Sequence, residues 1–294
     1  MNEIELRRRF FAEELEAVCK LQTAALVDAF ARVPRDQFLP PGPWTVLSSS
    51  GDSYMMGAGA QTQQTPDADP ARVHHNIAVA IDPERQLFNG QPGMLGAWID
   101  MLELRPAARV LHVGAGLGYY TAVIGECVGA TGRVLAFEID GPLATEAARR
   151  LRSRPWAEVR HGDASAPLPE SFDGILINAG VTHPLDPWLD ALAPGGRMLV
   201  PVTTTMPAMG STLGKGLILL LAKDETGSFT ARVITVVAVY SALGIRDPAM
   251  NDTIGKALMA GPVRWATVRR LRRDAHEPAP SCWLHRAECC ISSM

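Results

Sequence analysis

Strand and helix patterns alternate from about residue 92 to residue 202, and this alternation restricts the fold more than any other feature. Strand-like segments RVLHVGAG, GRVLAFEI, AEVRHGD, FDGILINAG and GGRMLVPV are separated by helical ones such as TAVIGECVG and LATEAARRL. Strands separated by helices of this length form βαβ units, which place parallel strands in a sheet with helices on both faces. After Val202, KGLILLLAKD and FTARVITVVAVYSAL follow each other across the turn-like ETGS. The sequence therefore predicts a doubly wound, mostly parallel α/β sheet with an antiparallel C-terminal strand pair.

Irregular segments flank this core. Apolar residues recur at helical spacing over residues 3–31, which predicts one amphipathic helix that stops before Pro34. VPRDQFLPPGPW is rich in proline and is expected to be extended or turned, and residues 42–72 read as a long surface loop that could act as a lid. We expect an N-terminal region over 1–75, a central domain that contains the sheet over 76–243 and a C-terminal extension over 244–294.

Composition excludes several classes of protein. Apolar residues make up 47% of the 294 residues and the net charge is −3, which argues against a disordered chain and against a nucleic-acid partner. No apolar run is long enough to cross a membrane, and MNEIELRRRF lacks the apolar core of a signal peptide. VRRLRR reads as an alternating strand that divides its charge between two faces. The five cysteines do not form a secreted disulfide pattern, so we expect the cytoplasm.

A glycine-rich loop follows the first strand of the core, in VLHVGAGLGYYTAV. Gly114, Gly116 and Gly118 permit tight turns and let the backbone approach a ligand closely. The third glycine comes one position too early for a dinucleotide fingerprint, and Tyr119 occupies the position of that glycine. The spacing therefore favours a nucleotide-like ligand without a pyrophosphate.

Polar residues follow the next three strands of the core. Glu138 ends the second strand, Asp163 follows the third, and Asn178 follows the fourth with Ala179 beside it. At the end of the second strand, the Glu138 carboxylate can accept hydrogen bonds from ribose hydroxyls. Asp163 could accept a hydrogen bond from an adenine amino group. Taken singly, Glu138 could instead be a helix cap and Asp163 a turn residue.

These motifs together resemble those of class I S-adenosylmethionine-dependent methyltransferases, which have a Rossmann-like sheet. The order VPRDQFLP, RQLFNGQPGM, VLHVGAGLGYYTAV is similar to that of the protein-L-isoaspartate O-methyltransferase family over roughly residues 5–203, apart from residues 42–72. The resemblance implies S-adenosyl-L-methionine as the cofactor and a protein or peptide as the substrate. It implies that the glycine loop binds the methionine part, Glu138 the ribose and Asp163 the adenine end. The expected cofactor-binding residues are Gly114, Ala115, Gly116, Gly118, Tyr119, Glu138, Ile139, Asp163, Ala164, Asn178 and Ala179.

The sequence departs from the family pattern in two places. His112 replaces an acidic residue two positions before the first glycine, and we expect a partly buried strand-end histidine rather than a catalytic base. Gly90-Gln91-Pro92-Gly93 replaces Ser-Gln-Pro-Tyr, so the serine hydroxyl and tyrosine ring that help to hold the isoaspartyl substrate are missing. We expect Asn89, Gln91 and the backbone around Gly90 to orient the methyl acceptor instead.

Three functions remain open from the sequence. The first is methylation of isoaspartyl carboxylates, which are ionised at neutral pH and require no general base. The second is a methyltransferase of changed specificity, acting on a modified peptide or a small molecule, and the lost side chains, inserted loop and added tail favour it. The third is a cofactor-binding protein without catalysis. The oligomeric state is left open.

The tail SCWLHRAECCIS contains soft metal ligands at close spacing. Its arrangement Cys282-x2-His285-x3-Cys289-Cys290 matches no paired-knuckle pattern, and adjacent cysteines rarely hold one ion together. The sequence therefore favours no metal site. A terminal strand that packs Trp283 and Leu284 onto the domain is the expected alternative.

Overall fold

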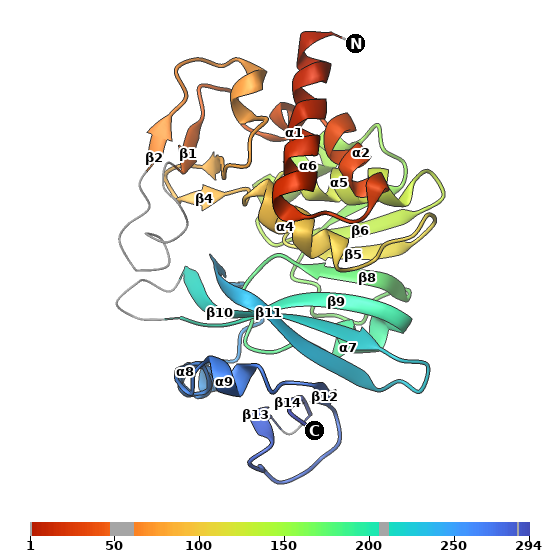
Figure 1. Ribbon diagram of the computed structural model, residues 1–294, viewed down its shortest axis with the longest axis vertical. Helices are drawn as coiled ribbons and strands as arrows, with labels where there is room; N and C mark the ends of the chain where they lie inside the picture. Colours follow the sequence, from red (N-terminus) through yellow and green to blue (C-terminus); the bar gives the residue numbers. More distant parts are fainter. Residues whose placement is uncertain (1, 48–61, 206–211, 287) are drawn as a thin grey trace. The chain divides into compact units, whose positions relative to one another are not determined.

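The computed structural model describes residues 2–47, 62–205, 212–286 and 288–294 (Figure 1). The chain divides into two compact units, Met1–Gly162 and Asp163–Met294, and each is described by itself. The domain boundaries expected after residues 75 and 243 stay predictions.

Two helices, α1 (Glu3–Cys19) and α2 (Ala24–Arg32), replace the single N-terminal helix predicted from the sequence. The chain leaves helical geometry at Lys20, whose φ of 55° is left-handed. The backbone N–H of Thr23 donates to the Asp100 carboxylate at 2.9 Å, which fixes the start of the second helix. The prediction of one helix was wrong because this break depends on a residue far along the chain. The two helices pack side by side (Figure 1).

The second helix ends before Pro34, as predicted. A 3-10 turn, η1 (Arg35–Phe38), lies inside the proline-rich segment, where only extended or turned chain was expected. In the described parts of the 42–72 loop, β1 (Thr45–Leu47) pairs antiparallel with β2 (Thr62–Gln64). The centre of this loop lies outside the described residues. The prediction that the loop forms a lid therefore also falls outside them. Further along are η2 (Pro70–Val73) and an antiparallel pair, β3 (Ala80–Asp82) and β4 (Leu87–Phe88).

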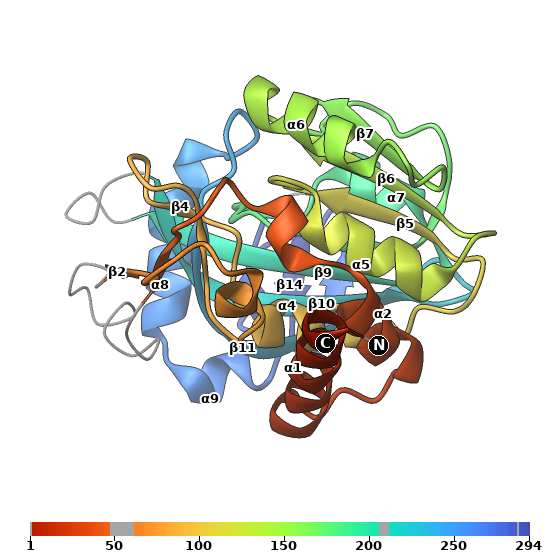
Figure 2. The same ribbon diagram turned by 90° about the horizontal axis from the view of Figure 1, so that it is seen from above.

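The parallel core of the first unit follows the predicted order. Strand β5 pairs parallel with β6, and β6 with β7. Helices α5 and α6 lie along these strands (Figure 2). The elements are α4 (Pro92–Asp100), β5 (Arg109–Val113), α5 (Tyr119–Val128), β6 (Arg133–Glu138), α6 (Gly141–Leu151) and β7 (Ala157–His161).

The second unit begins with a further parallel pair and continues antiparallel. Strands β8 and β9 are parallel, and β10 then pairs antiparallel with both β9 and β11. The predicted C-terminal antiparallel pair is therefore confirmed. The elements of this part of the second unit are β8 (Phe172–Ile177), α7 (Asp186–Ala191), β9 (Leu192–Thr205), β10 (Leu213–Lys223) and β11 (Phe229–Tyr240).

The C-terminal segment adds short helices and strands to the second unit. Strand β11 pairs with β12, β12 with β14, and β14 with β13, all antiparallel. The strand predicted over VRRLRR is reduced to its three residues Arg270–Arg272. Trp283 and Leu284 are buried, as expected of a packed terminal strand. The elements are η4 (Pro248–Met250), α8 (Asn251–Met259), α9 (Pro262–Trp265), β12 (Arg270–Arg272), β13 (Cys282–Leu284) and β14 (Cys290–Ser292).

Among the described residues, no helix combines the length and the apolar composition that a membrane span requires.

Candidate functional site

The glycine loop between β5 and α5 supplies the main chain of the candidate site. Gly114, Gly116 and Gly118 have φ values of +86°, +55° and +90°, a region that residues with a Cβ rarely adopt. The backbone N–H of Gly114 donates to the Phe137 carbonyl at 2.8 Å, which ties the loop to the end of β6. The φ of Gly118 favours glycine there, and a Cβ would lie 2.9 Å from Leu151 Cδ1, so that side chain would have to move. Ala115, between the first two glycines, is buried.

Glu138 ends β6, as the sequence predicted, and its carboxylate lies against the glycine loop. Oε2 accepts the backbone N–H of Gly116 at 2.7 Å, and Oε1 accepts that of Asp140 at 3.0 Å. Burial raises the pKa of this carboxyl, while the same backbone donors act to lower it. An ionised carboxylate offers about four acceptor positions, so Glu138 can also accept from the hydroxyls of a ligand. Ile139 follows on the surface and is 40% exposed.

His112 is fully buried inside the first unit, not partly buried as expected. Its Nδ1 lies 2.9 Å from the Thr121 hydroxyl on α5, and its Nε2 has no hydrogen-bond partner among the described residues. Burial lowers the pKa of His112 to about 4, so the ring is neutral at neutral pH. The side chain therefore belongs to the packing between β5 and α5, which agrees with the expectation that it is no catalytic base.

Tyr119 begins α5, but its ring is only 2% exposed. It packs at tilted angles against Phe30 and Phe38, with ring centroids 6.4 and 6.0 Å away. Burial raises the pKa of its hydroxyl above the usual range. The ring serves the core of the first unit, so only the backbone of Tyr119 is left as a candidate contact for a cofactor.

The expected acceptor-orienting segment, Asn89 to Gln91, lies in the same unit. Asn89 Oδ1 accepts from the backbone N–H of Val79 at 3.2 Å, and Asn89 Nδ2 has no partner in the described part of the chain. The Gly90 carbonyl accepts from the Tyr120 hydroxyl at 3.2 Å. Gln91 is exposed and donates through Nε2 to the Asn76 carbonyl at 2.9 Å. These hydrogen bonds hold the loop in one conformation. Among the donors named here, Asn89 Nδ2 is the one without an acceptor in the described part of the chain.

The guanidinium of Arg35 holds this loop in place through hydrogen bonds. This role was not predicted from the sequence. The side chain is completely buried. Its guanidinium donates to the carbonyls of Val73, His75, Ile77 and Gly90 and to Asn89 Oδ1, at 2.7 to 3.4 Å. Burial lowers its pKa. The signal was present, because Arg35 lies within VPRDQFLP, one of the motifs that carry the family resemblance.

The remaining predicted residues belong to the second unit. Asp163 Oδ1 accepts from the Ser165 N–H at 3.0 Å and hydroxyl at 2.7 Å, and these bonds lower the pKa of Asp163. Ala164 has a φ of 56°, and its carbonyl accepts from Trp188 Nε1 at 2.9 Å. Asn178 and Ala179 directly follow β8 and are half-buried. Asp163 is thus the turn residue that the alternative interpretation described, and its role at the adenine stays a prediction.

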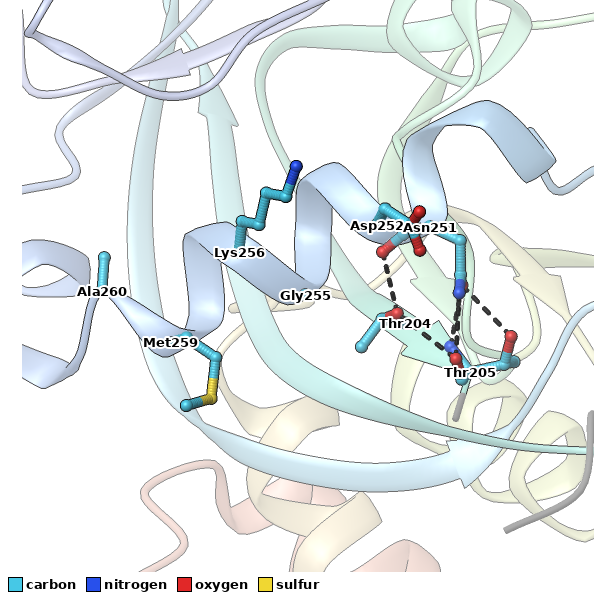
Figure 3. Close-up of a pocket in the computed structure, with 8 residues that line it drawn as sticks. All are labelled: Thr204, Thr205, Asn251, Asp252, Gly255, Lys256, Met259 and Ala260. Carbon is cyan, nitrogen blue, oxygen red and sulfur yellow. Dashed lines mark hydrogen bonds between the residues drawn. The ribbon is translucent and has the colours of Figure 1, made fainter. Parts of the chain in front are cut away.

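A hollow in the second unit lies between the end of β9 and α8 (Figure 3). Asn251 Oδ1 accepts from the Thr205 N–H at 2.8 Å and Nδ2 donates to the Thr205 carbonyl at 2.9 Å, so these polar groups bond one another. It contains none of the predicted site residues. Its lining comprises Thr204, Thr205, Asn251, Asp252, Gly255, Lys256, Met259 and Ala260.

A glycine loop after the first parallel strand, with a buried carboxylate at the end of the second, is the arrangement of a class I S-adenosylmethionine-dependent methyltransferase. Residues 63–215, about half of the chain, match the protein-L-isoaspartate(D-aspartate) O-methyltransferase family. The chain belongs to that family.

Individual relatives agree with this assignment. A protein-L-isoaspartate O-methyltransferase of Aeropyrum pernix is 31% identical over 65% of this chain and 65% of its own length. Protein-L-isoaspartate O-methyltransferase 2 of Syntrophobacter fumaroxidans is 30% identical over 74% of this chain and 75% of its own length. The match thus spans about two thirds to three quarters of the length of these relatives.

Solved structures show the same fold. A protein-L-isoaspartate O-methyltransferase superposes with a TM-score of 0.60 over 90% of this chain and 72% of its own, at 19% identity. A Plasmodium falciparum beta-aspartate methyltransferase in complex with S-adenosyl-L-homocysteine superposes with a TM-score of 0.58 over 80% of this chain and 97% of its own, at 14% identity. The predicted fold class is confirmed.

Proposed function

We propose that this protein transfers a methyl group from S-adenosyl-L-methionine to the carboxylate of an isoaspartyl residue in a protein or peptide. The observation that carries the proposal is the contact between Gly116 N–H and Glu138 Oε2, at 2.7 Å. It joins the two parts of the first unit that the family resemblance assigns to the cofactor. Family membership supports the acceptor, since both relatives named above are protein-L-isoaspartate O-methyltransferases.

The residues of the first unit fit the cofactor. Glu138 would accept from the ribose hydroxyls, and the backbone of residues 114–119 would surround the methionine part, where left-handed glycines bring the main chain close to a ligand. When bound, the cofactor supplies a methyl group on a positively charged sulfur. Asp163, Ala164, Asn178 and Ala179 are kept as proposed contacts for the adenine end.

The acceptor needs orientation more than activation. A carboxylate is ionised at neutral pH and attacks without a general base. Fixing such a nucleophile against a reactive carbon is worth about 7–11 kcal/mol of the barrier in favourable cases. The proposed orienting groups are the exposed amide of Gln91 and the Nδ2 group of Asn89, which is buried and has no partner among the described residues.

A second candidate is a methyltransferase whose acceptor differs from an isoaspartyl residue. Gly90 has a φ of +78°, and a Cβ there would lie 2.9 Å from Leu95 Cδ2. A Cβ at Gly93 would lie 2.4 Å from Cys19 Sγ. A serine at position 90 would be strained by this φ, and a tyrosine at position 93 would require Cys19 and Asn76 to move, which favours altered specificity.

Two measurements separate these functions from a protein that binds the cofactor without turnover. Labelled S-adenosylmethionine is incubated with an isoaspartyl peptide and with the aspartyl peptide of the same sequence as control. The proposal expects label on the isoaspartyl peptide alone. Binding of S-adenosylhomocysteine by calorimetry without label on this peptide would reject isoaspartyl transfer, and no binding at millimolar ligand would reject the cofactor as well.

We also propose that the protein works in the reducing cytoplasm. All five cysteines are free, although two of them, Cys289 and Cys290, are adjacent in the chain. Free thiols persist in reducing compartments, whereas secreted domains tend to pair them.

A further inference from the structure

Four side chains of metal-binding types meet near the C-terminus of the second unit. They are His276, Cys282, His285 and Cys290, and one ligand atom from each lies within 4.8 Å of the others. Zinc bonds of about 2.0–2.3 Å would place tetrahedral ligand atoms roughly 3.3–3.8 Å apart. Cys282 Sγ and His276 Nε2 are already 3.6 Å apart. Small side-chain adjustments would therefore complete a tetrahedron around one ion.

The strand pairing creates this cluster. Cys282 begins β13 and Cys290 begins β14, and these strands pair antiparallel with an irregularity between Cys282 and Leu284. His285 directly follows β13. The four ligand residues are thus close in sequence as well as in space. A local adjustment of their side chains is enough to bind an ion.

The ring of His276 is held by a contact outside the cluster. Its Nδ1 lies 2.8 Å from the Asp274 carbonyl oxygen, which can only accept, so Nδ1 carries the proton. The lone pair is then on Nε2, the atom that faces Cys282. Metal-binding histidines characteristically donate their other ring N–H to such a carbonyl. The backbone N–H of Ala279 also points at Cys282 Sγ, at 3.4 Å, and would stabilise a thiolate.

His285 provides an independent indication of a ligand. Its Nδ1 is buried and has no hydrogen-bond partner among the residues that the structure describes. An unsatisfied buried polar atom is costly, and a bound cation would remove that cost. The ring lies edge-on to that of His276, with centroids 4.9 Å apart, so both imidazoles belong to one packed group.

We propose that His276, Cys282, His285 and Cys290 bind one Zn²⁺ ion as a closed structural site. Two sulfurs and two imidazole nitrogens suit zinc, and both thiols release their protons on binding, so the complete site is neutral. Four protein ligands leave no open coordination position, which distinguishes a structural from a catalytic zinc. The spacing of ligands in the sequence favoured no metal because that pattern includes Cys289 and lacks His276, whereas the fold brings His276 into the cluster and leaves Cys289 out.

Metal content of the full-length protein tests the proposal. The protein is purified without a tag, in the presence of a thiol reductant, and zinc is measured by mass spectrometry. We expect about one zinc ion per chain, and less than about a tenth in the double variant Cys282→Ser/Cys290→Ser. Cys289→Ser is the matched control, since it removes the neighbouring thiol and should keep the zinc. The proposal fails if wild-type protein supplied with zinc contains none, or if Cys290→Ser keeps the ion that Cys289→Ser loses.

Cobalt substitution of the wild-type protein covers the case in which the serine variants do not fold. Cobalt bound in place of zinc should give the intense visible absorption of a tetrahedral ion with thiolate charge transfer. Weak absorption typical of six oxygen ligands would reject the site. Recovery of a disulfide-linked peptide joining Cys282 to Cys290 from reductant-treated protein would reject it too.

Discussion

At the scale of single residues, Arg35 shows how a buried cation can be held without a carboxylate. Among the described residues its hydrogen-bond partners are carbonyl groups of the segment 73–90 and the amide oxygen of Asn89. Five donors in a planar fork can reach several carbonyls at once, whereas a lysine ammonium has three donors on a flexible stem. The conformation of the acceptor loop therefore depends on one guanidinium.

Replacing Arg35 by alanine should destabilise the fold strongly. Several buried carbonyls would lose their donor and a cavity would remain, so we expect a loss of about 3–5 kcal/mol in the free energy of unfolding. Urea unfolding measures this loss. The exposed Arg152→Ala is the control and should change stability by less than about 0.5 kcal/mol. A loss below about 1 kcal/mol for Arg35→Ala would contradict the role given to its hydrogen bonds.

His112 should make stability depend on pH. Its pKa is about 4 in the folded protein and about 6.5 when unfolded, so below pH 6.5 the unfolded chain binds more protons. Stability contributed by the neutral ring is present above pH 6.5 and declines as the pH falls toward 4. Between pH 8 and pH 5 the free energy of unfolding should fall by about 2 kcal/mol because of His112. His74, whose pKa is also lowered to about 4, acts in the same direction.

The variant His112→Gln isolates this contribution, because glutamine can still hydrogen-bond Thr121 but does not titrate. Its loss of stability between pH 8 and pH 5 should be smaller than that of the wild type by about 2 kcal/mol. Denaturant unfolding at both pH values gives the comparison. Equal losses in the two proteins would mean that folding does not lower the pKa of His112.

Glu138→Gln should weaken cofactor binding, and it also removes one of the two backbone hydrogen bonds that the carboxylate accepts. An amide keeps the size of the side chain but replaces one charge-assisted acceptor by a donor, at a cost of about 1.5–3 kcal/mol. The dissociation constant for S-adenosylhomocysteine should rise about 10- to 100-fold in calorimetry. Glu84→Gln, on the exposed β3–β4 turn, should bind as the wild type does. Unchanged affinity in Glu138→Gln would remove this residue from the cofactor site.

At the scale of elements, the N-terminal helix pair shows where sequence patterns stop being informative. The apolar periodicity continues from Leu15 to Phe30 without a glycine or proline, so a single helix was the natural prediction. The break lies at Lys20 and depends on Asp100, which accepts from the backbone at the start of α2. Periodicity reports which residues are buried, but it cannot reveal a cap supplied from a distant helix.

Lys20→Gly should stabilise the protein. A lysine at φ 55° is strained, and glycine adopts this geometry without cost, so we expect a gain of up to about 1 kcal/mol in the free energy of unfolding. Lys20→Ala is the matched control, since it shortens the side chain but keeps the Cβ and should bring no gain. If alanine stabilises as much as glycine, left-handed strain is not the cause.

The parallel strands, the glycine loop and the carboxylate at the end of β6 were predictable because they depend on local patterns. Gly116 was expected just after the first core strand and Glu138 at the end of the second, because the apolar run of each strand is plain in the sequence. Arg35 and His276 were missed for a shared reason. Their partners are backbone carbonyls or residues brought near by strand pairing, and neither leaves a residue-type signature at a fixed spacing.

At the scale of the whole molecule, the proposed functions are distributed along the chain. The glycine loop and Glu138 belong to the first unit, and the four metal-binding side chains to the second. Strand β12 pairs with β11 at Phe229 and Thr230 and with β14 at Cys290. The proposed zinc site is therefore connected by two strand pairings to the long hairpin of the second unit.

Removing the metal should destabilise the second unit selectively. Zinc that binds only the folded chain adds its binding free energy to stability, and a loss of 1 kcal/mol lowers the melting temperature of a chain of this size by about 2–4 °C. A strong chelator should therefore lower the melting temperature of the wild type and leave that of Cys282→Ser/Cys290→Ser unchanged. Hydrogen exchange should locate the loosening in residues 264–294, while β5, β6 and β7 keep their protection. An equal loss of protection in those parallel strands would show that the ion stabilises the chain as a whole and not its C-terminal strands.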